Sequence, residues 1–244
     1  MDKDYESMYH AAEDTQWWFV TRQNFVCAYL RKRSFPPTTR ILDIGCGGGG
    51  MIRRLHSTGF TEVNGIDISP EAIRYAQSRN LTRVQVADAE KKLPFADASF
   101  DVIIASDVLE HIDDTEKALV ECARILATGG IAIIFVPAFQ WMWSHRDVVN
   151  HHRWRFTLPQ LSHIMEGARF KIVLASYWSM LLMIPYFCVM QAMRLSRKKI
   201  LEIKKEESFI NTAMTHILNF ENSLILHPYR LPFGISCVII GEKH

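Results

Sequence analysis

The stretch 41–50, ILDIGCGGGG, constrains the fold more than any other part of the chain. A short, mostly apolar strand runs directly into a turn that contains five glycines. Glycine permits positive φ angles and lets backbone N–H groups approach a ligand closely. A helix that follows such a turn adds a positive partial charge at its N-terminus, which suits an anionic group. The stretch therefore predicts a strand–loop–helix unit whose loop binds a ligand.

The spacing of the glycines leaves the ligand open. Gly45, Gly47 and Gly50 satisfy G-x-G-x-x-G, the dinucleotide-binding spacing, but a tight strand-to-helix turn without a ligand is an alternative interpretation. Asp67 follows Gly45 by 22 residues and ends the next expected strand. A carboxylate there can accept hydrogen bonds from a ribose diol, which either a nicotinamide or an adenosyl cofactor would supply. Asp67 could instead cap the following helix, although Ser69 is better placed for that.

From residue 40 onward, short apolar runs alternate with helical patterns, which is typical of a parallel sheet with crossover helices. Strands are expected at 40–44, 62–67, 83–87, 100–106, 130–137, 171–177 and 235–241. Helices are expected at 49–58, 70–79, 115–126, 157–166 and 207–226. Ser69 and Pro70 predict the N-cap and first residue of the second helix. Gly129 and Gly130 predict the end of the third.

Composition narrows the class of protein. The 244 residues are 48% hydrophobic and 22% charged, which is ordinary for a globular protein that folds without disulfide or metal staples. Lys and Arg total 28 against 26 Asp and Glu, so no nucleic-acid partner is expected. The five cysteines are scattered, which argues against a disulfide scaffold or zinc site. The polar first ten residues lack the apolar core of a signal peptide, so a cytoplasmic location is expected.

Further motifs follow the glycine loop in a fixed order. Asp88 follows the third expected strand, 99–112 (SFDVIIASDVLEHI) contains the fourth strand, and 126–130 (LATGG) leads into the fifth. With the D-x-G-x-G-x-G loop and Asp67, these segments resemble the class I S-adenosylmethionine-dependent methyltransferases. The similarity is to their small-molecule branch, which includes the methyltransferase type 11 and ubiquinone-methyltransferase-like proteins, and it covers about residues 38–140.

The resemblance implies an α/β fold, a Rossmann-like three-layer α/β/α sandwich. Its seven-stranded, mostly parallel sheet would have the order 3-2-1-4-5-7-6 with the last strand antiparallel. We expect one methyltransferase domain over residues 1–244, and divide it into four parts. These are an N-terminal helical lid (1–37), a cofactor-binding core (38–177), a helical insertion (178–232) and the last strand (233–244). The implied cofactor is S-adenosyl-L-methionine, the implied product is S-adenosyl-L-homocysteine, and no metal is expected.

The resemblance also implies which residues bind the cofactor. Those expected at its methionine end are Asp43, Gly45, Cys46, Gly47, Ser106 and Asp107. Those expected at its adenosine end are Asp67 for the ribose, Ile68 beside the adenine, and Asp88 and Ala89 at the adenine amine. Asp43 would orient the amino group, and Cys46 is expected only as a small loop residue, because nothing nearby would activate its thiol. Trp18 and Arg22 lie one helical turn apart, and both could face this site from the lid.

Methyl transfer to a hydroxyl or amine also requires removal of a proton, which suits a histidine near the methyl group. His111 is the first candidate, with packing as the alternative role. The segment 141–156 is the second, because it contains three histidines, one aspartate and three arginines. His145 and His151 are the candidates there; with Asp147 they could also be metal ligands, but no carboxylate cluster accompanies them. The arginines predict either an anionic group on the acceptor or salt bridges within the loop.

The insertion begins with an apolar segment, 178–193, which is shorter than the ~20 residues that span a bilayer. Basic residues follow it, so contact through 178–205 with a membrane surface or a second copy is one interpretation. A roof over an apolar acceptor and an ordinary buried helix are the others. Together, the segment 141–156, the insertion and the ending 232–236 resemble a bacterial subgroup associated with lipid-linked or cell-envelope glycan chemistry.

The predicted function is methyl transfer from S-adenosylmethionine to oxygen (or nitrogen) of a small, partly apolar acceptor, anionic or lipid-linked. The alternatives are an NAD(P)-dependent oxidoreductase and a non-catalytic, cofactor-binding regulatory protein.

Overall fold

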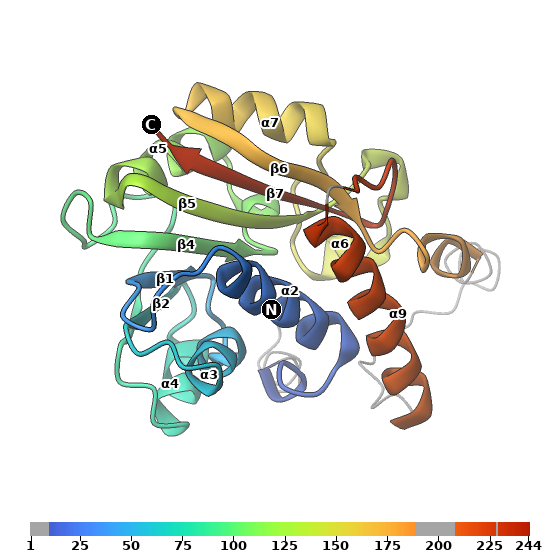
Figure 1. Ribbon diagram of the computed structural model, residues 1–244, viewed down its shortest axis with the longest axis horizontal. Helices are drawn as coiled ribbons and strands as arrows, with labels where there is room; N and C mark the ends of the chain where they lie inside the picture. Colours follow the sequence, from blue (N-terminus) through green and yellow to red (C-terminus); the bar gives the residue numbers. More distant parts are fainter. Residues whose placement is uncertain (1–9, 189–207, 228) are drawn as a thin grey trace.

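A seven-stranded sheet of order β3-β2-β1-β4-β5-β7-β6 runs through the protein (Figure 1). The computed structural model describes residues 10–188, 208–227 and 229–244. The strands are β1 (Ile41–Ile44), β2 (Val63–Asp67), β3 (Val84–Val86), β4 (Phe100–Ser106), β5 (Leu126–Pro137), β6 (Phe170–Trp178) and β7 (Ser236–Lys243). The pairs among β1–β5 are parallel, whereas β7 is antiparallel to both β5 and β6. The predicted strand order and the antiparallel last strand are confirmed.

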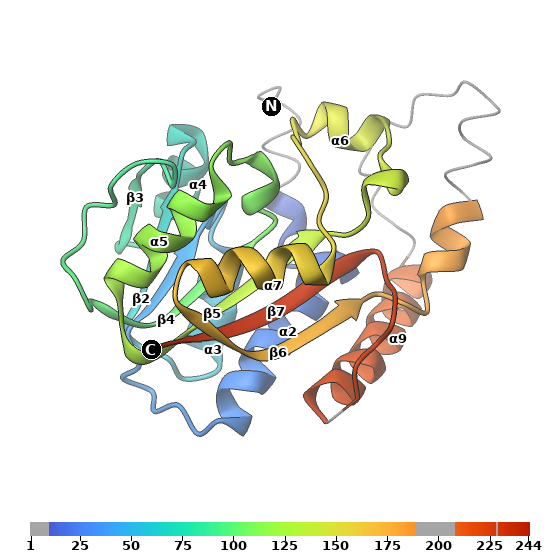
Figure 2. The same ribbon diagram turned by 90° about the horizontal axis from the view of Figure 1, so that it is seen from above.

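Helices cover both faces of the sheet. They are α2 (Trp17–Lys32), α3 (Gly50–Ser57), α4 (Pro70–Ser78), α5 (Thr115–Ile125), α6 (His145–Val149), α7 (Leu158–Gly167) and α9 (Ser208–Leu226), with 3-10 turns η1 (Leu109–His111) and η2 (Gln140–Met142). Helices α5 and α7 lie on one face, and α2, α3, α4 and α9 lie on the other (Figures 1 and 2). The predicted three-layer α/β/α sandwich is therefore confirmed.

The local sequence explains the central elements. All four residues of β1 are buried, as expected for a parallel strand that is covered on both faces. Ser69 caps α4 by accepting a hydrogen bond from Ala72 N at 3.2 Å, and Pro70 is the first residue of that helix. This start signal is confirmed.

The end of α5 differs from the prediction. The helix ends at Ile125, and the chain joins the sheet at once, with Leu126 paired to Phe100. Gly129, with a φ of 74°, therefore lies within β5 rather than after a helix, and the pairing of β4 with β5 shifts register there. The expectation that Gly129 and Gly130 end the helix was wrong, because the chain pairs with β4 before it reaches the glycines. The positive φ that glycine permits accommodates the register shift there.

The predicted lid and insertion pack against each other. Trp17 N donates to Asn211 Oδ1 at 2.7 Å, and Asn222 Nδ2 donates to Thr21 O at 2.8 Å, so α2 and α9 lie side by side. Residues 1–9 of the predicted lid and 189–207 of the predicted insertion are outside the described residues. The roles given to these parts, as lid, cofactor-binding core and insertion, stay predictions.

The beginning of the insertion is partly exposed. Leu181, Ile184 and Phe187 face solvent, whereas Leu182 is buried. In the ranges that the structure describes, we find no helix with the length and apolar character needed to cross a bilayer. Contact with a membrane surface or a second copy through 178–205 stays a prediction, of which 189–205 lies outside the described residues.

Candidate functional site

The glycine loop is fixed to the neighbouring strand. Gly45 N and Cys46 N both donate to Ile66 O, at 2.8 and 2.9 Å. Gly45 has a φ of 71°, and a Cβ there would lie 2.4 Å from Val108 Cγ2, so only glycine fits this position. Burial raises the pKa of the Cys46 thiol far above its usual range, which agrees with an inert loop residue. The carboxyl end of β1 thus holds a rigid backbone turn.

Asp67 connects this turn to the end of β2. Its Oδ2 accepts from Gly47 N and its Oδ1 accepts from Ser69 N, both at 2.9 Å. Burial raises the pKa of Asp67, and the two backbone N–H groups oppose that shift. Each carboxylate oxygen keeps a second lone pair, so a ribose diol can still bind.

Asp43 lies beneath the loop and is 3% exposed. Within the described ranges its carboxyl makes no hydrogen bond. Burial raises the pKa of Asp43 well above its usual range, and the negative charges of Glu13 and Asp67 add to that shift. A buried carboxyl without a partner fits a ligand that brings an ammonium group, such as the methionine end of S-adenosylmethionine. The residues present therefore fit the predicted cofactor.

The adenosine end has a different character. Ile68, directly after β2, is 68% exposed, and such an apolar surface suits the face of an adenine ring. Asp88 accepts from Glu90 N at 2.9 Å and from Lys91 Nζ at 3.1 Å, which lower its pKa. Ala89 packs against the hydrophobic core.

The exit of β4 meets the N-terminal helix. Asp107 follows Ser106, has a φ of 56°, and forms an ion pair with Arg22 of α2. Arg22 is 2% exposed; it also donates to Ser236 Oγ at 3.0 Å and lies 4.3 Å from the centroid of the Trp18 ring. Trp18 and Arg22 thus share a side of α2, at the carboxyl end of β4.

The candidate histidines do not form one cluster. His145 and His151 are exposed, at the start and just beyond the end of α6. Asp147 is buried; its carboxylate accepts from Arg155 Nε at 2.8 Å and Ser144 N at 2.7 Å, which together with other contacts keep its pKa low. Asp147 therefore fixes the loop and is not grouped with His145 or His151 as a set of metal ligands.

His152 is less exposed than the two candidate histidines of this segment, His145 and His151. Its Nδ1 lies 2.9 Å from Asp147 Oδ1, and its ring contacts that of His111 edge-to-face at 4.9 Å. Burial lowers the pKa of His111 to about 4, while its hydrogen bond to the backbone of His151 opposes the shift. The dense histidine and arginine pattern marked this loop but did not single out His152.

Glu110, next to His111 in η1, has the most unusual environment of the carboxyls in this region. It is fully buried, neither oxygen has a hydrogen-bond partner in the described part of the chain, and burial raises its pKa to about 8. His152 Nε2 lies 4.0 Å from Glu110 Oε1. Glu110, His111 and His152 each offer one potential ligand atom, all within 4.8 Å of one another. Glu13, which no sequence motif marks, also contacts the glycine loop from the N-terminal segment.

Comparison with known proteins agrees with this geometry. Residues 42–134 match the family described as "Methyltransferase domain". The chain is 36% identical over 100 residues to the ubiquinone biosynthesis O-methyltransferase of Caulobacter sp. (strain K31). That match covers 39% of this chain and 39% of the relative, so the chain spans about two fifths of that protein's length.

Solved structures share the fold. An S-adenosylmethionine-dependent methyltransferase from Mesorhizobium loti superimposes with a TM-score of 0.58 at 16% identity, over 87% of this chain and 95% of that one. A phosphoethanolamine N-methyltransferase from Haemonchus contortus, solved with S-adenosylhomocysteine, gives a TM-score of 0.56 at 23% identity, over 89% and 52%. The resemblance stated from the motifs is thus confirmed.

Proposed function

We propose that this chain, whose residues 42–134 match the family described as "Methyltransferase domain", is a class I S-adenosylmethionine-dependent methyltransferase that transfers a methyl group to an oxygen of a small, partly apolar acceptor. The observation that carries the proposal is the arrangement at the ends of β1 and β2. There the buried Asp43, which has no hydrogen-bond partner among the described residues, lies near Asp67 and the rigid turn at Gly45. When bound, S-adenosylmethionine supplies an activated methyl group on its sulfonium.

The chain's own residues would position the cofactor. Asp43 would bind its amino group, Asp67 its ribose and Ile68 its adenine, while Arg22 and Asp107 would border its methionine end. Fixing both reactants in line can contribute about 7–11 kcal/mol to lowering the barrier. The ion pair of Arg22 with Asp107 supports this, because it holds the closing helix against the reacting edge.

An aromatic run supports the apolar character of the acceptor. Phe139, just after β5, stacks on the buried Tyr177 at 4.7 Å and on Trp141 at 5.6 Å. Trp141, which is 56% exposed, contacts Phe187 edge-to-face at 6.0 Å. The run therefore leads from the core to the surface beside the carboxyl end of the sheet, where open α/β folds bind ligands.

Two of the three arginines of 141–156 are already paired, which favours an acceptor without a strong anionic group at those two. Arg155 is paired with Asp147, and Arg153 is paired with Asp113, so both charges are already balanced. This supports the salt-bridge interpretation for these two residues.

For removal of the acceptor's proton we propose the pair of His111 and His152. An ionised Asp147 only accepts hydrogen bonds, so Nδ1 of His152 is the donor in this contact. The low pKa of His111 keeps that ring neutral at pH 7. His145 and His151, whose side chains are exposed, are weaker candidates.

The sheet gives no support to an NAD(P)-dependent oxidoreductase, because the dinucleotide-binding fold is all parallel with the order 3-2-1-4-5-6. The test of the proposed reaction is incubation with methyl-labelled S-adenosylmethionine and separate quinone, lipid-linked and sugar acceptors. Label in one acceptor pool, with release of S-adenosylhomocysteine, is the expected result. Tight cofactor binding without transfer to any pool would favour the non-catalytic alternative.

A further inference from the structure

A buried carboxylate from the N-terminal segment lies on the glycine loop. Glu13 Oε1 accepts from Gly48 N and Glu13 Oε2 accepts from Gly50 N, both at 2.9 Å. These are N–H groups at the start of α3, where the helix dipole favours a negative charge. Glu13 is 6% exposed, so the contact is a built part of the fold.

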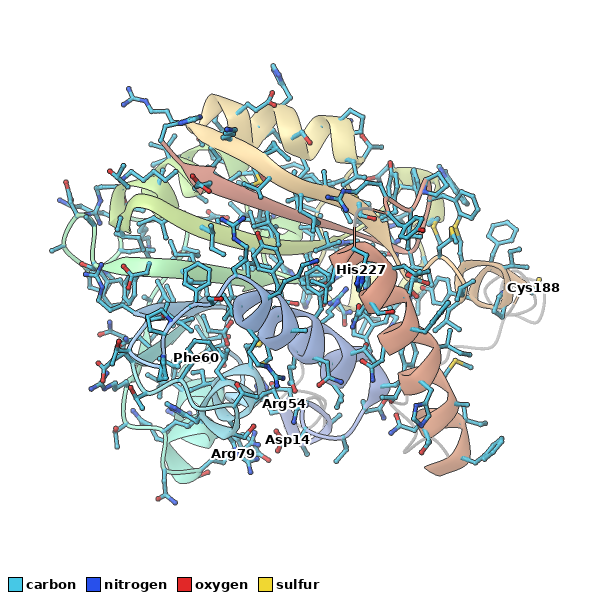
Figure 3. All side chains as sticks on the ribbon, viewed as in Figure 1. Asp14, Arg54, Phe60, Arg79, Cys188 and His227 are labelled. Carbon is cyan, nitrogen blue, oxygen red and sulfur yellow. The ribbon has the colours of Figure 1, made fainter. Side chains whose placement is uncertain are left out.

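The segment around Glu13, residues 10–16, contacts α2, α3 and the end of α4. His10 Nδ1 lies 2.7 Å from Glu13 Oε1, and Gln23 Nε2 of α2 donates to Glu13 O at 3.0 Å. Asp14 forms ion pairs with Arg53 of α3 and with Arg79 at the end of α4. Figure 3 shows Asp14 and Arg79 together at the base of these helices. We call residues 10–16 the strap.

The strap can approach the loop this closely only because Gly47 and Gly50 have no side chains. A Cβ on Gly47 would lie 2.5 Å from Glu13 Oε1, and a Cβ on Gly50 would lie 2.7 Å from Glu13 Cβ. Because Gly47 also donates to Asp67, Glu13 reaches the same turn that borders the ribose carboxylate. The strap and the candidate cofactor site therefore share one backbone segment.

Three acidic side chains lie around this turn. Glu13, Asp43 and Asp67 surround it, and the charges of Glu13 and Asp67 both disfavour ionisation of Asp43. Of the cationic side chains near it, Arg79 is paired with Asp14, and His10 lies 2.7 Å from Glu13 Oε1. S-adenosylmethionine carries one net positive charge through its sulfonium, whereas S-adenosylhomocysteine carries none. A negative turn attracts the first more strongly than the second.

We infer that Glu13 is a positioning residue of the cofactor site, which fixes the glycine loop and adds a charge that favours S-adenosylmethionine over S-adenosylhomocysteine. The inference rests on the proposed function. It explains how the site would bind the substrate form of the cofactor and release the product form.

The test is titration calorimetry of the full chain with S-adenosylmethionine and, separately, S-adenosylhomocysteine. Glu13→Gln keeps the size of the side chain and removes its charge. We expect it to weaken S-adenosylmethionine binding by about tenfold and S-adenosylhomocysteine binding by only about threefold. Glu62→Gln is the matched control: it removes the same charge from an exposed pair with Arg83 and should leave both affinities unchanged.

Equal losses for the two ligands, or no loss, would overturn the inference, since a purely mechanical role changes both affinities alike. Thermal unfolding of Glu13→Gln verifies that the compared proteins are folded. If the unaltered chain binds neither ligand, the proposed function itself fails, which distinguishes that result from a failure of the inference alone.

Discussion

Arg22 and Asp107, 85 residues apart, form a part-buried ion pair that joins α2 to the carboxyl end of β4. Asp107 has a φ of 56°, a conformation that residues other than glycine seldom adopt. The Arg22 guanidinium is enclosed by the rings of Trp18 and Trp178, at 4.3 and 5.1 Å from their centroids. Strained backbone persists where its surroundings fix it, so the ion pair fixes α2 to the carboxyl end of β4.

Arg22→Met should therefore destabilise the protein strongly. The variant keeps the apolar stem between the two indole rings but leaves Asp107 without its charged partner. We expect the free energy of unfolding to fall by about 2–4 kcal/mol, measured by urea denaturation. Arg74→Met is the control, because Arg74 forms only an exposed pair with Glu71 and should cost less than about 0.5 kcal/mol. Equal stability of the two variants would contradict a structural role for the ion pair.

Asp67→Ala should weaken S-adenosylhomocysteine binding at least about tenfold, which is the loss expected for one charge-assisted ribose contact. The change also frees Gly47 N and Ser69 N, so the loss has a second source in the looser glycine turn. Calorimetry gives the dissociation constant directly. Asp97→Ala, at an exposed carboxylate paired with Arg124, should bind like the unaltered chain. Unchanged affinity in Asp67→Ala would refute the ribose assignment.

Glu110 should give the protein a distinctive pH dependence. Its folded-state pKa is about 8, whereas an unfolded glutamate titrates near about 4.3. Between these values the unfolded chain binds fewer protons, so Glu110 makes stability fall as pH rises. Glu110→Gln cannot titrate there. Its stability relative to the unaltered chain should rise with pH from 5 to 8, by at most about 1.4 kcal/mol per unit, and then level off.

Urea denaturation at whole pH units from 5 to 9 measures this difference. Subtracting the unaltered chain cancels the opposite contribution of His111, whose low folded pKa makes stability rise with pH between about 4 and 6.5. Glu62→Gln, at an exposed position, should show a flat difference. A flat difference for Glu110→Gln as well would mean that Glu110 ionises normally in the folded protein.

Gly45→Ala should be costly for two separable reasons, its φ of 71° and the 2.4 Å approach to Val108 Cγ2. We expect a loss of about 2–4 kcal/mol in unfolding free energy and weaker S-adenosylhomocysteine binding. Gly59→Ala isolates the backbone cost, because Gly59 has a φ of 103° and nothing near its Cβ. Adding Val108→Ala to Gly45→Ala should restore part of the lost stability. No restoration would place the cost in the backbone alone.

Much of the fold followed from local patterns. The strands from β1 to β4 begin and end within about two residues of the expected bounds, because apolar runs, Ser69 with Pro70, and the glycine loop all act locally. The position of Asp67 next to the glycine turn also followed, since the carboxyl ends of neighbouring parallel strands meet at one edge of the sheet. The strand order itself came from the family resemblance.

Other features depend on packing that no local pattern records. Nothing in the sequence distinguishes Glu110 from an ordinary polar residue. It is buried because the chain after α6 packs over it, where Arg153 N donates to Glu110 O at 2.8 Å. Helix α6 has five residues, which is too short for a periodicity that would tell His152 from His145. Glu13 belongs to a polar N-terminal stretch, and only the folded chain brings it to the glycine loop.

We expect the turn at 45–50 to bind an adenosyl-methionine cofactor. Titration calorimetry of the unaltered chain with S-adenosylhomocysteine and with NAD tests it most directly. We expect saturable binding of one S-adenosylhomocysteine per chain and no comparable binding of NAD. Preferential binding of NAD would contradict it.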